Sequence, residues 1–188
     1  VDFLDNSSNT WGGAMYNGDS SSPTLTNVNF ISNSANYGAG MYNISSSQTL
    51  TNVLFEDHWS FGGDGAGMYN YQFSSPVLTN VIFRDNANLG MGGGMYNLEN
   101  SSPTLRDVIF MTTTSRSGGG VFNQNNSSPV LINSQFIANS ATQWGGGMYN
   151  NNSCDPTLTN CTFVANSSET GRGGGMINDQ SSPVLTNV

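Results

Sequence analysis

The sequence predicts an all-β fold: a three-sided, right-handed parallel β-helix (a β-solenoid) of about seven coils of 26–28 residues. Gly-Gly-Gly-Met-Tyr-Asn, or a near copy of it, occurs seven times, each followed by a form of Ser-Ser-Pro-Thr-Leu-Thr-Asn-Val-x-Phe-x-x-Asn, which is cut short in the last copy. A fixed period of this size indicates a stack of similar units. Glycines and a proline in each unit leave no uninterrupted window for a helix.

Each unit is predicted to hold three strands, because its constant segments are short and alternate between inward and outward residues. In one coil these strands cover residues 24–26, 28–30 and 41–43. Leu25 of the first strand faces the interior, and so do Val28 and Phe30 of the second. Met41 of the third faces the interior and Tyr42 faces outward. The connecting segments vary in length from unit to unit, as surface loops do.

Asparagine recurs three times in a coil, and we predict corners at Asn27, Asn33 and Asn43 because this residue tolerates left-handed backbone. Equivalent asparagines in stacked coils lie ~4.8 Å apart, so their side-chain amides can bond each other along the rod. The predicted ladder of the Met-Tyr-Asn motif consists of Asn17, Asn43, Asn70, Asn97, Asn123, Asn150 and Asn178.

Composition argues against several functions. There are 12 Asp and Glu but only four Arg and no Lys, for a net charge of −8. Binding to nucleic acid needs a basic stripe, so we expect no such partner. No run of ~18 apolar residues occurs, so we expect no membrane insertion by this segment. Cys154 and Cys161 are too far apart on an extended segment for a disulfide, and we expect two buried free thiols, no metal and no cofactor.

The Gly-Gly-[Ala/Gly]-hydrophobic motif alternating with Phe-x-x-Asn resembles the repeats of polymorphic outer-membrane proteins and of related autotransporter-passenger β-helices. It is also similar to repeats in large secreted β-helix proteins of environmental bacteria. The resemblance covers residues 1–188 and implies one β-solenoid segment, extracellular or at the cell surface, with no catalytic residue to carry over. Val1 and Val188 occupy the same place in the repeat, so we expect an excerpt of a longer repeat protein.

One cluster of ionisable residues is a weak catalytic candidate. Asp57 and Asp85 occupy equivalent places in adjacent coils, so they should stack roughly 5 Å apart, a separation that retaining glycosidases use. His58, the only histidine, follows at the corner beside them. The alternative is a solvated face on which Glu56 pairs with Arg84, and this alternative is favoured.

Two outward columns are candidate binding surfaces. An exposed aromatic stripe could bind a sugar or a protein, although the favoured alternative is that the rings stack on one another and stiffen the rod. This stripe consists of Tyr16, Tyr42, Tyr69, Tyr96, Phe122, Tyr149, Trp11 and Trp144. A flat Thr-x-Thr array resembles the ice-binding faces of some antifreeze β-solenoids, although threonine is also simply a good strand residue. This array consists of Thr24, Thr26, Thr49, Thr51, Thr79, Thr157 and Thr159.

These observations favour a non-enzymatic structural or adhesive segment of a secreted or cell-surface β-helix. Open coil ends expose strand edges, so the expected partner is a second copy stacked end to end in a fibre. A host or cell-surface glycan or protein is the other expected partner. A carbohydrate-binding or carbohydrate-active β-helix and an ice-binding protein are the alternatives.

Overall fold

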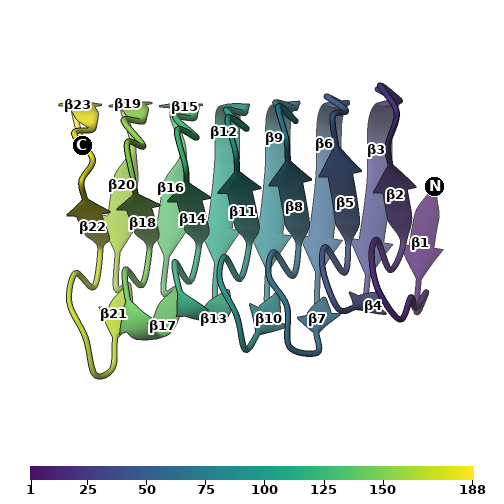
Figure 1. The fold of residues 1–188 in the computed structure, drawn as a ribbon, viewed down its shortest axis with the longest axis horizontal. Coiled ribbons are helices and arrows are strands. Elements are labelled where there is room, and N and C mark those ends of the chain that lie inside the picture. The colour runs from purple at the N-terminus through teal and green to yellow at the C-terminus, as the bar shows by residue number, and fades with distance from the viewer.

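The computed structural model describes residues 1–188 and is built from strands alone, wound into a rod of stacked coils. Figure 1 views the rod across its axis, with the N-terminal coil at the right and the C-terminal coil at the left. Every strand pairs in parallel with its equivalent in the next coil, which confirms the predicted β-solenoid. No helix is long and apolar enough to cross a membrane.

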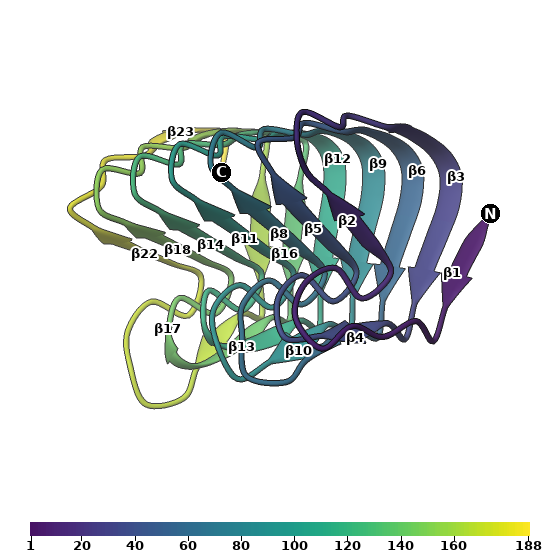
Figure 2. The ribbon, with the colours of Figure 1, turned by 45° about the vertical axis from the view of Figure 1, so that its right-hand side comes forward.

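One sheet, here called the kinked sheet, contains ten strands and follows the Thr-Leu-Thr-Asn-Val-x-Phe segments. In β3 (Thr24–Ile31) the two strands predicted at 24–26 and 28–30 form one strand that passes through Asn27, a residue with φ of 56°. Figure 2 shows the curvature of these long strands. The others are β1 (Asp2–Leu4), β6 (Thr49–Glu56), β9 (Val77–Arg84), β12 (Thr104–Met111), β15 (Val130–Ile132), β16 (Gln135–Ile137), β19 (Thr157–Thr159), β20 (Thr162–Val164) and β23 (Val184–Thr186).

The Met-Tyr-Asn sheet contains seven strands, one from each copy of the glycine motif. They are β2 (Met15–Asn17), β5 (Met41–Ile44), β8 (Met68–Tyr71), β11 (Met95–Leu98), β14 (Val121–Gln124), β18 (Met148–Asn151) and β22 (Met176–Asp179). These strands lie in front of the kinked sheet in Figure 1. The side chains of Met41, Met68 and Met95 are fully buried, so the inward position of methionine is confirmed.

A third sheet, here called the short sheet, was not predicted, because its residues lie in the segments expected to be loops. Its six strands run along the lower side of the rod in Figure 1. They are β4 (Ser34–Ala35), β7 (Trp59–Ser60), β10 (Ala87–Asn88), β13 (Thr114–Ser117), β17 (Ser140–Trp144) and β21 (Ser167–Ser168). The inward column contains small residues such as Ala35, Ser60 and Ala141.

The interior is a stack of mostly identical apolar side chains, because the register pairs each residue with its equivalent in the next coil. Leu50 pairs with Leu78, and Phe55 pairs with Phe83. The rings of Phe55 and Phe83 are parallel to within 5°, with centroids 4.8 Å apart. Twenty buried residues form this continuous core. A sequence with few apolar residues therefore still buries a core, since each coil places them in the same position.

Glycine is required where the chain turns into the Met-Tyr-Asn sheet. Gly65 has φ of 62°, a left-handed conformation that glycine adopts without strain. A Cβ on Gly67 would lie 2.5 Å from the carbonyl oxygen of Gly94 and 2.7 Å from Cδ1 of Phe83. The third glycine of the motif therefore permits close approach of the next coil.

Two of the three predicted asparagine corners are wrong. Asn27 does have left-handed backbone, but at the other two corners the turn falls on Ser32 and Ser45. Asn33 and Asn43 are instead buried, with exposed fractions of 1% and 0%. Their side-chain amides lie inside the rod, where a polar group must find a hydrogen-bond partner.

The predicted Met-Tyr-Asn ladder is confirmed. Each asparagine Nδ2 donates to Oδ1 of the next, at 3.0 Å from Asn17 to Asn43 and at 2.8 Å in the five later steps. A second, exposed ladder lies at the Asn27 corner, where Asn52 Nδ2 donates to Asn27 Oδ1 at 3.0 Å. Serines form a further interior ladder, in which the Ser74 backbone N–H donates to Ser101 Oγ at 3.2 Å. These bonds tie each coil to the next.

Both cysteines are buried free thiols, as predicted. Cys154 takes the place of a serine in the interior ladder, and its backbone N–H donates to Ser181 Oγ at 3.0 Å. Burial raises the pKa of the Cys154 thiol, and burial likewise raises that of Cys161. Neutral thiols of this kind are poor nucleophiles, so they act here as small core residues.

Candidate functional site

His58 lies inside the rod rather than on its surface. Its side chain replaces an asparagine in an interior corner column, and only 1% of it is exposed. The backbone N–H of Asn33 donates to His58 Nδ1 at 3.0 Å, and the backbone N–H of His58 donates to Asn86 Oδ1 at 3.1 Å. Because Nδ1 accepts a hydrogen bond, the ring is neutral and carries its proton on Nε2, which has no partner. Burial lowers the pKa of His58 to about 3.

Asp57 and Asp85 lie outside the rod at equivalent corners of adjacent coils. Each carboxylate accepts a hydrogen bond from a hydroxyl of a neighbouring coil: Ser32 Oγ donates to Asp57 Oδ2 at 3.0 Å, and Thr112 Oγ1 donates to Asp85 Oδ1. The prediction that His58 lies beside them is wrong, because Asp57 takes the left-handed conformation and the residue after it turns inward. The three residues are not brought together as an acid, a base and a nucleophile.

The charges around these carboxylates form a surface ion-pair network. Arg84 donates through Nε and Nη2 to Glu56 Oε1, as was predicted. The two residues face each other in β6 and β9. Arg84 Nε also lies 3.8 Å from Asp85 Oδ2. The Arg84 side chain is 40% exposed, so solvent screens these pairs. No group of three or more His, Cys, Asp or Glu side chains is placed to hold a metal ion.

The aromatic stripe is largely buried, which corrects the prediction of an exposed column. Tyr42, Tyr69, Tyr96, Phe122 and Tyr149 have exposed fractions of 2–7% and form a second apolar cluster. Side chains on both flanks, among them Tyr37 and Leu98, pack against this column. Ring centroids of neighbours in the stripe are 4.7–5.6 Å apart. Alternation showed which side of the sheet the rings occupy, but not that the flanking segments cover them.

Burial also sets the acidity of the tyrosines. It raises the pKa of Tyr42 to about 12, and it raises those of Tyr69 and Tyr96 as well. Burial similarly raises the pKa of Asp64, which lies near Tyr69 and Tyr96 and accepts a hydrogen bond from the Met91 backbone N–H at 2.7 Å. These shifts follow from packing inside the rod.

At the ends of the aromatic stripe, the side chains of Trp11, Tyr16 and Trp144 remain 41–51% exposed.

The Thr-x-Thr array forms in register on the outer face of the kinked sheet. Thr24 pairs with Thr49, and Thr26 pairs with Thr51, which pairs with Thr79. Thr157 and Thr159 lie farther along the same two columns. Val77, Arg106 and Ile132 interrupt the columns. The face is therefore regular in its backbone spacing and mixed in its side chains.

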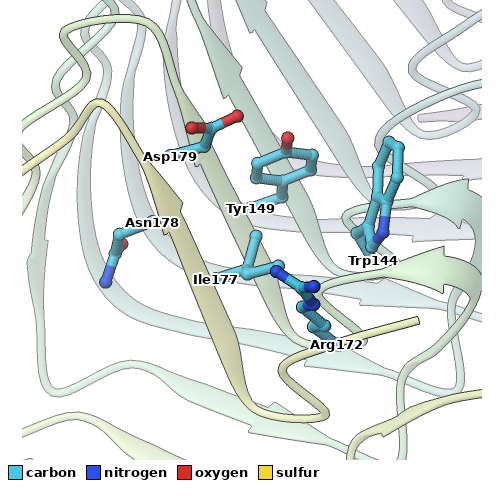
Figure 3. A pocket seen from close by; sticks show the side chains of 6 residues that line it. All are labelled: Trp144, Tyr149, Arg172, Ile177, Asn178 and Asp179. Carbon is cyan, nitrogen blue, oxygen red and sulfur yellow. The ribbon is translucent and has the colours of Figure 1, made fainter.

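Two hollows occur on the surface. The one in Figure 3, of about 450 Å³, lies at the last coil, where Arg172 and Ile177 lie near Tyr149 and Trp144. The other, of about 390 Å³, crosses the outer face of the short sheet over four successive coils. It is lined by Trp59, Asn88, Leu89, Thr114, Ser115, Arg116, Thr142 and Gln143. None of these residues was singled out from the sequence, although a tryptophan at 59, where other coils carry Ser, Ala or Thr, was a usable signal.

A family model described as right handed beta helix region matches residues 12–188. No curated protein and no solved structure matches the chain.

Proposed function

The chain belongs to the right-handed β-helix family, and from this premise we propose that it is a non-enzymatic structural or adhesive segment of a secreted or cell-surface protein. The main support is that the repeated polar residues serve coil-to-coil bonding. The Asn and Ser ladders occupy the residues that the repeat preserves. Outward positions such as those of Trp59, Ala87 and Thr114 also vary from coil to coil, and a binding function would reside at positions of this kind.

The placement of His58 supports a non-enzymatic role. A general base must reach the proton that it removes, and the Nδ1 of His58 is occupied by a backbone N–H inside the rod. The carboxylates of Asp57 and Asp85 are exposed, and each is bound by a hydroxyl of a neighbouring coil. The proposal expects no turnover on a broad glycan panel. Turnover that disappears in Asp57→Asn and Asp85→Asn would overturn it in favour of a carbohydrate-active enzyme.

Assembly with a second copy is part of this proposal, as is the resemblance to polymorphic outer-membrane and autotransporter-passenger repeats. The outermost strands of the Met-Tyr-Asn sheet, β2 and β22, each have one unpaired edge in this 188-residue chain. Leu185 of β23 occupies the position at which Leu158 is buried, but it is itself 49% exposed, so a second copy could cover it. Prepared as a separate molecule, the chain should form rods longer than one copy in electron micrographs as its concentration rises. Single-length particles at every concentration would contradict end-to-end stacking.

Ice binding is a second candidate, supported by one observation. The in-register columns of Thr24 and Thr26 repeat at a regular inter-coil spacing of ~4.8 Å, and ice recognition depends on such regularity. Arg106, which projects from the face, should disturb it. Thermal hysteresis that increases in Arg106→Thr would support this function. The absence of ice shaping by both proteins would remove it.

A further inference from the structure

Three large apolar side chains are exposed on the outer side of the short sheet in two adjacent coils. Trp59 of β7 and Phe61 directly after this strand have exposed fractions of 41% and 52%. Leu89 follows β10 in the next coil and is 65% exposed. These three residues are here called the apolar patch. An exposed apolar cluster is typical of a surface that a partner covers, whereas single exposed apolar residues need no explanation.

The apolar patch is a local departure from a polar face. In the preceding coil, Ser34 pairs with Trp59 in the same outward column. In the coils that follow, Ala87 pairs with Thr114, and Thr114 pairs with Ser140. The large apolar side chains are therefore confined to two coils, and both lie away from the ends of the rod.

One cation lies beside the apolar patch. The hollow of about 390 Å³ extends from Trp59 and Leu89 to Arg116 and Gln143, and Arg116 is the only charged residue that lines it. Arg116 Nε donates to Gln143 Oε1 at 2.9 Å, which holds the guanidinium in place. Both ion pairs of the chain involve Arg84, so Arg116 pairs with no carboxylate of this chain. The hollow is thus locally positive on a chain whose net charge is −8.

We infer that the apolar patch and Arg116 dock an extended segment of a partner protein, which carries a bulky apolar residue and an acidic residue. The inference rests on the proposed adhesive function and names its partner. The apolar side chain of the partner fills the hollow beside Trp59 and Leu89. Its carboxylate accepts hydrogen bonds from the free N–H donors of Arg116. A nucleic acid would need a strongly positive groove, which one arginine does not supply.

The stacking of the coils sets the spacing of the two residues in the partner. Leu89 and Arg116 belong to adjacent coils, and Trp59 lies one coil farther from Arg116. At an inter-coil spacing of ~4.8 Å, Arg116 lies about 5–10 Å along the rod axis from the apolar contacts. In an extended peptide, residues i and i+2 project to the same side about 6.7 Å apart. The partner segment therefore carries its acidic residue two positions from its apolar residue.

Short synthetic peptides, labelled with a dye and titrated with the whole chain by fluorescence anisotropy, test this inference. The first peptide carries Phe and Glu at positions i and i+2. The second replaces this Glu with Gln, and the third moves the Glu to position i+1, where it projects to the opposite side. The chain should bind the first peptide about fivefold more tightly than either of the others.

Variants of the chain assign the binding to this surface. Arg116→Gln should remove the preference for Glu over Gln, whereas Leu89→Ala should weaken the binding of both peptides about tenfold. Arg106→Gln is the control matched in charge, because Arg106 is exposed on the kinked sheet and lies outside the hollow. This control should leave binding unchanged. Far-UV circular dichroism of every variant checks that the solenoid remains folded.

The outcomes separate the docking surface from the proposed function. No binding of any peptide, or a preference for Glu that Arg116→Gln retains, overturns the docking surface and leaves the non-enzymatic rod intact. Self-association that is lost in Phe61→Ser, in place of peptide binding, overturns it in favour of a second copy of the chain. Peptide binding that leads to cleavage, detected by mass spectrometry, supports the docking surface and overturns the non-enzymatic function.

Discussion

Replacing His58 with Asn tests whether the His58 ring is buried in its neutral form in the interior corner column. The substitution should change how the free energy of unfolding depends on pH. In the folded chain His58 is neutral, because its Nδ1 accepts the Asn33 N–H and its ring is buried. In the unfolded chain the ring is free to protonate. Asn is the residue that neighbouring coils carry at this corner, as at Asn86. His58→Asn therefore keeps a hydrogen-bonding side chain and removes the titrating group.

The expected size of the effect follows from the two pKa values. The pKa of His58 falls from 6.5 to about 3 on folding. A base whose pKa is lowered by folding makes its full contribution to the stability of the folded protein above about pH 6.5. This contribution is lost as the pH falls toward 3. At about pH 5 the unfolded chain gains about 2 kcal/mol from protonating His58, while the folded chain gains almost nothing.

The assay is urea unfolding of wild type and His58→Asn between about pH 7.5 and pH 5. Carboxylates titrate in both proteins, so the difference between the two curves isolates His58. The wild type should lose about 2 kcal/mol more than the variant over this range. Because His58 is the only histidine, its ring resonances in an NMR titration report the folded pKa directly. Equal pH dependence of the two proteins, or a folded pKa near 6.5, would refute the reasoning.

Three further substitutions are measured by the same unfolding assay. Burial raises the pKa of Asp64, so ionised Asp64 destabilises the folded state at neutral pH. Asp64→Asn should therefore be more stable than wild type near pH 7, with an advantage that shrinks as the pH falls. A constant advantage would contradict this. Gly67→Ala places a Cβ 2.5 Å from a carbonyl oxygen and should cost about 1–3 kcal/mol. Gly62→Ala, whose Cβ would meet nothing closer than 3.9 Å, is its control. Asn97→Ala leaves two buried ladder groups unpaired and should cost about 2–5 kcal/mol. Asn80→Gly, in the exposed ladder, should cost less than half as much, and equal losses would count against the interior ladder.

The repeat was enough to predict the fold, because a period of this length with inward Leu50 and Phe55 has few other structural solutions. It also predicted the Met-Tyr-Asn ladder. The two-residue strands of the short sheet could not be predicted, since two residues show no alternation. The corner error at Asn33 has a similar cause: the residue before it takes the left-handed conformation and turns Asn33 inward.

The candidate sites were less predictable, because a binding surface depends on what covers it. Alternation placed Tyr69 on the outer side of its sheet, but residues from the variable connectors bury it. The groove at Trp59 depends on the pairing of short strands that connectors of unequal length bring into register. A local motif does not encode that alignment. His58 was placed on the wrong side for the same reason as Asn33: the left-handed residue before it, Asp57, turns it inward.

Side-chain amide exchange tests most directly whether the repeated asparagines hold the coils together from inside. The Nδ2 protons of Asn70 and Asn97 are buried and bonded along the rod, whereas those of Asn52 and Asn80 belong to the exposed ladder. In an NMR exchange experiment on the folded chain, the interior pair should exchange only when the coils open, and therefore far more slowly than the exposed pair. Equally fast exchange of both pairs would contradict the account.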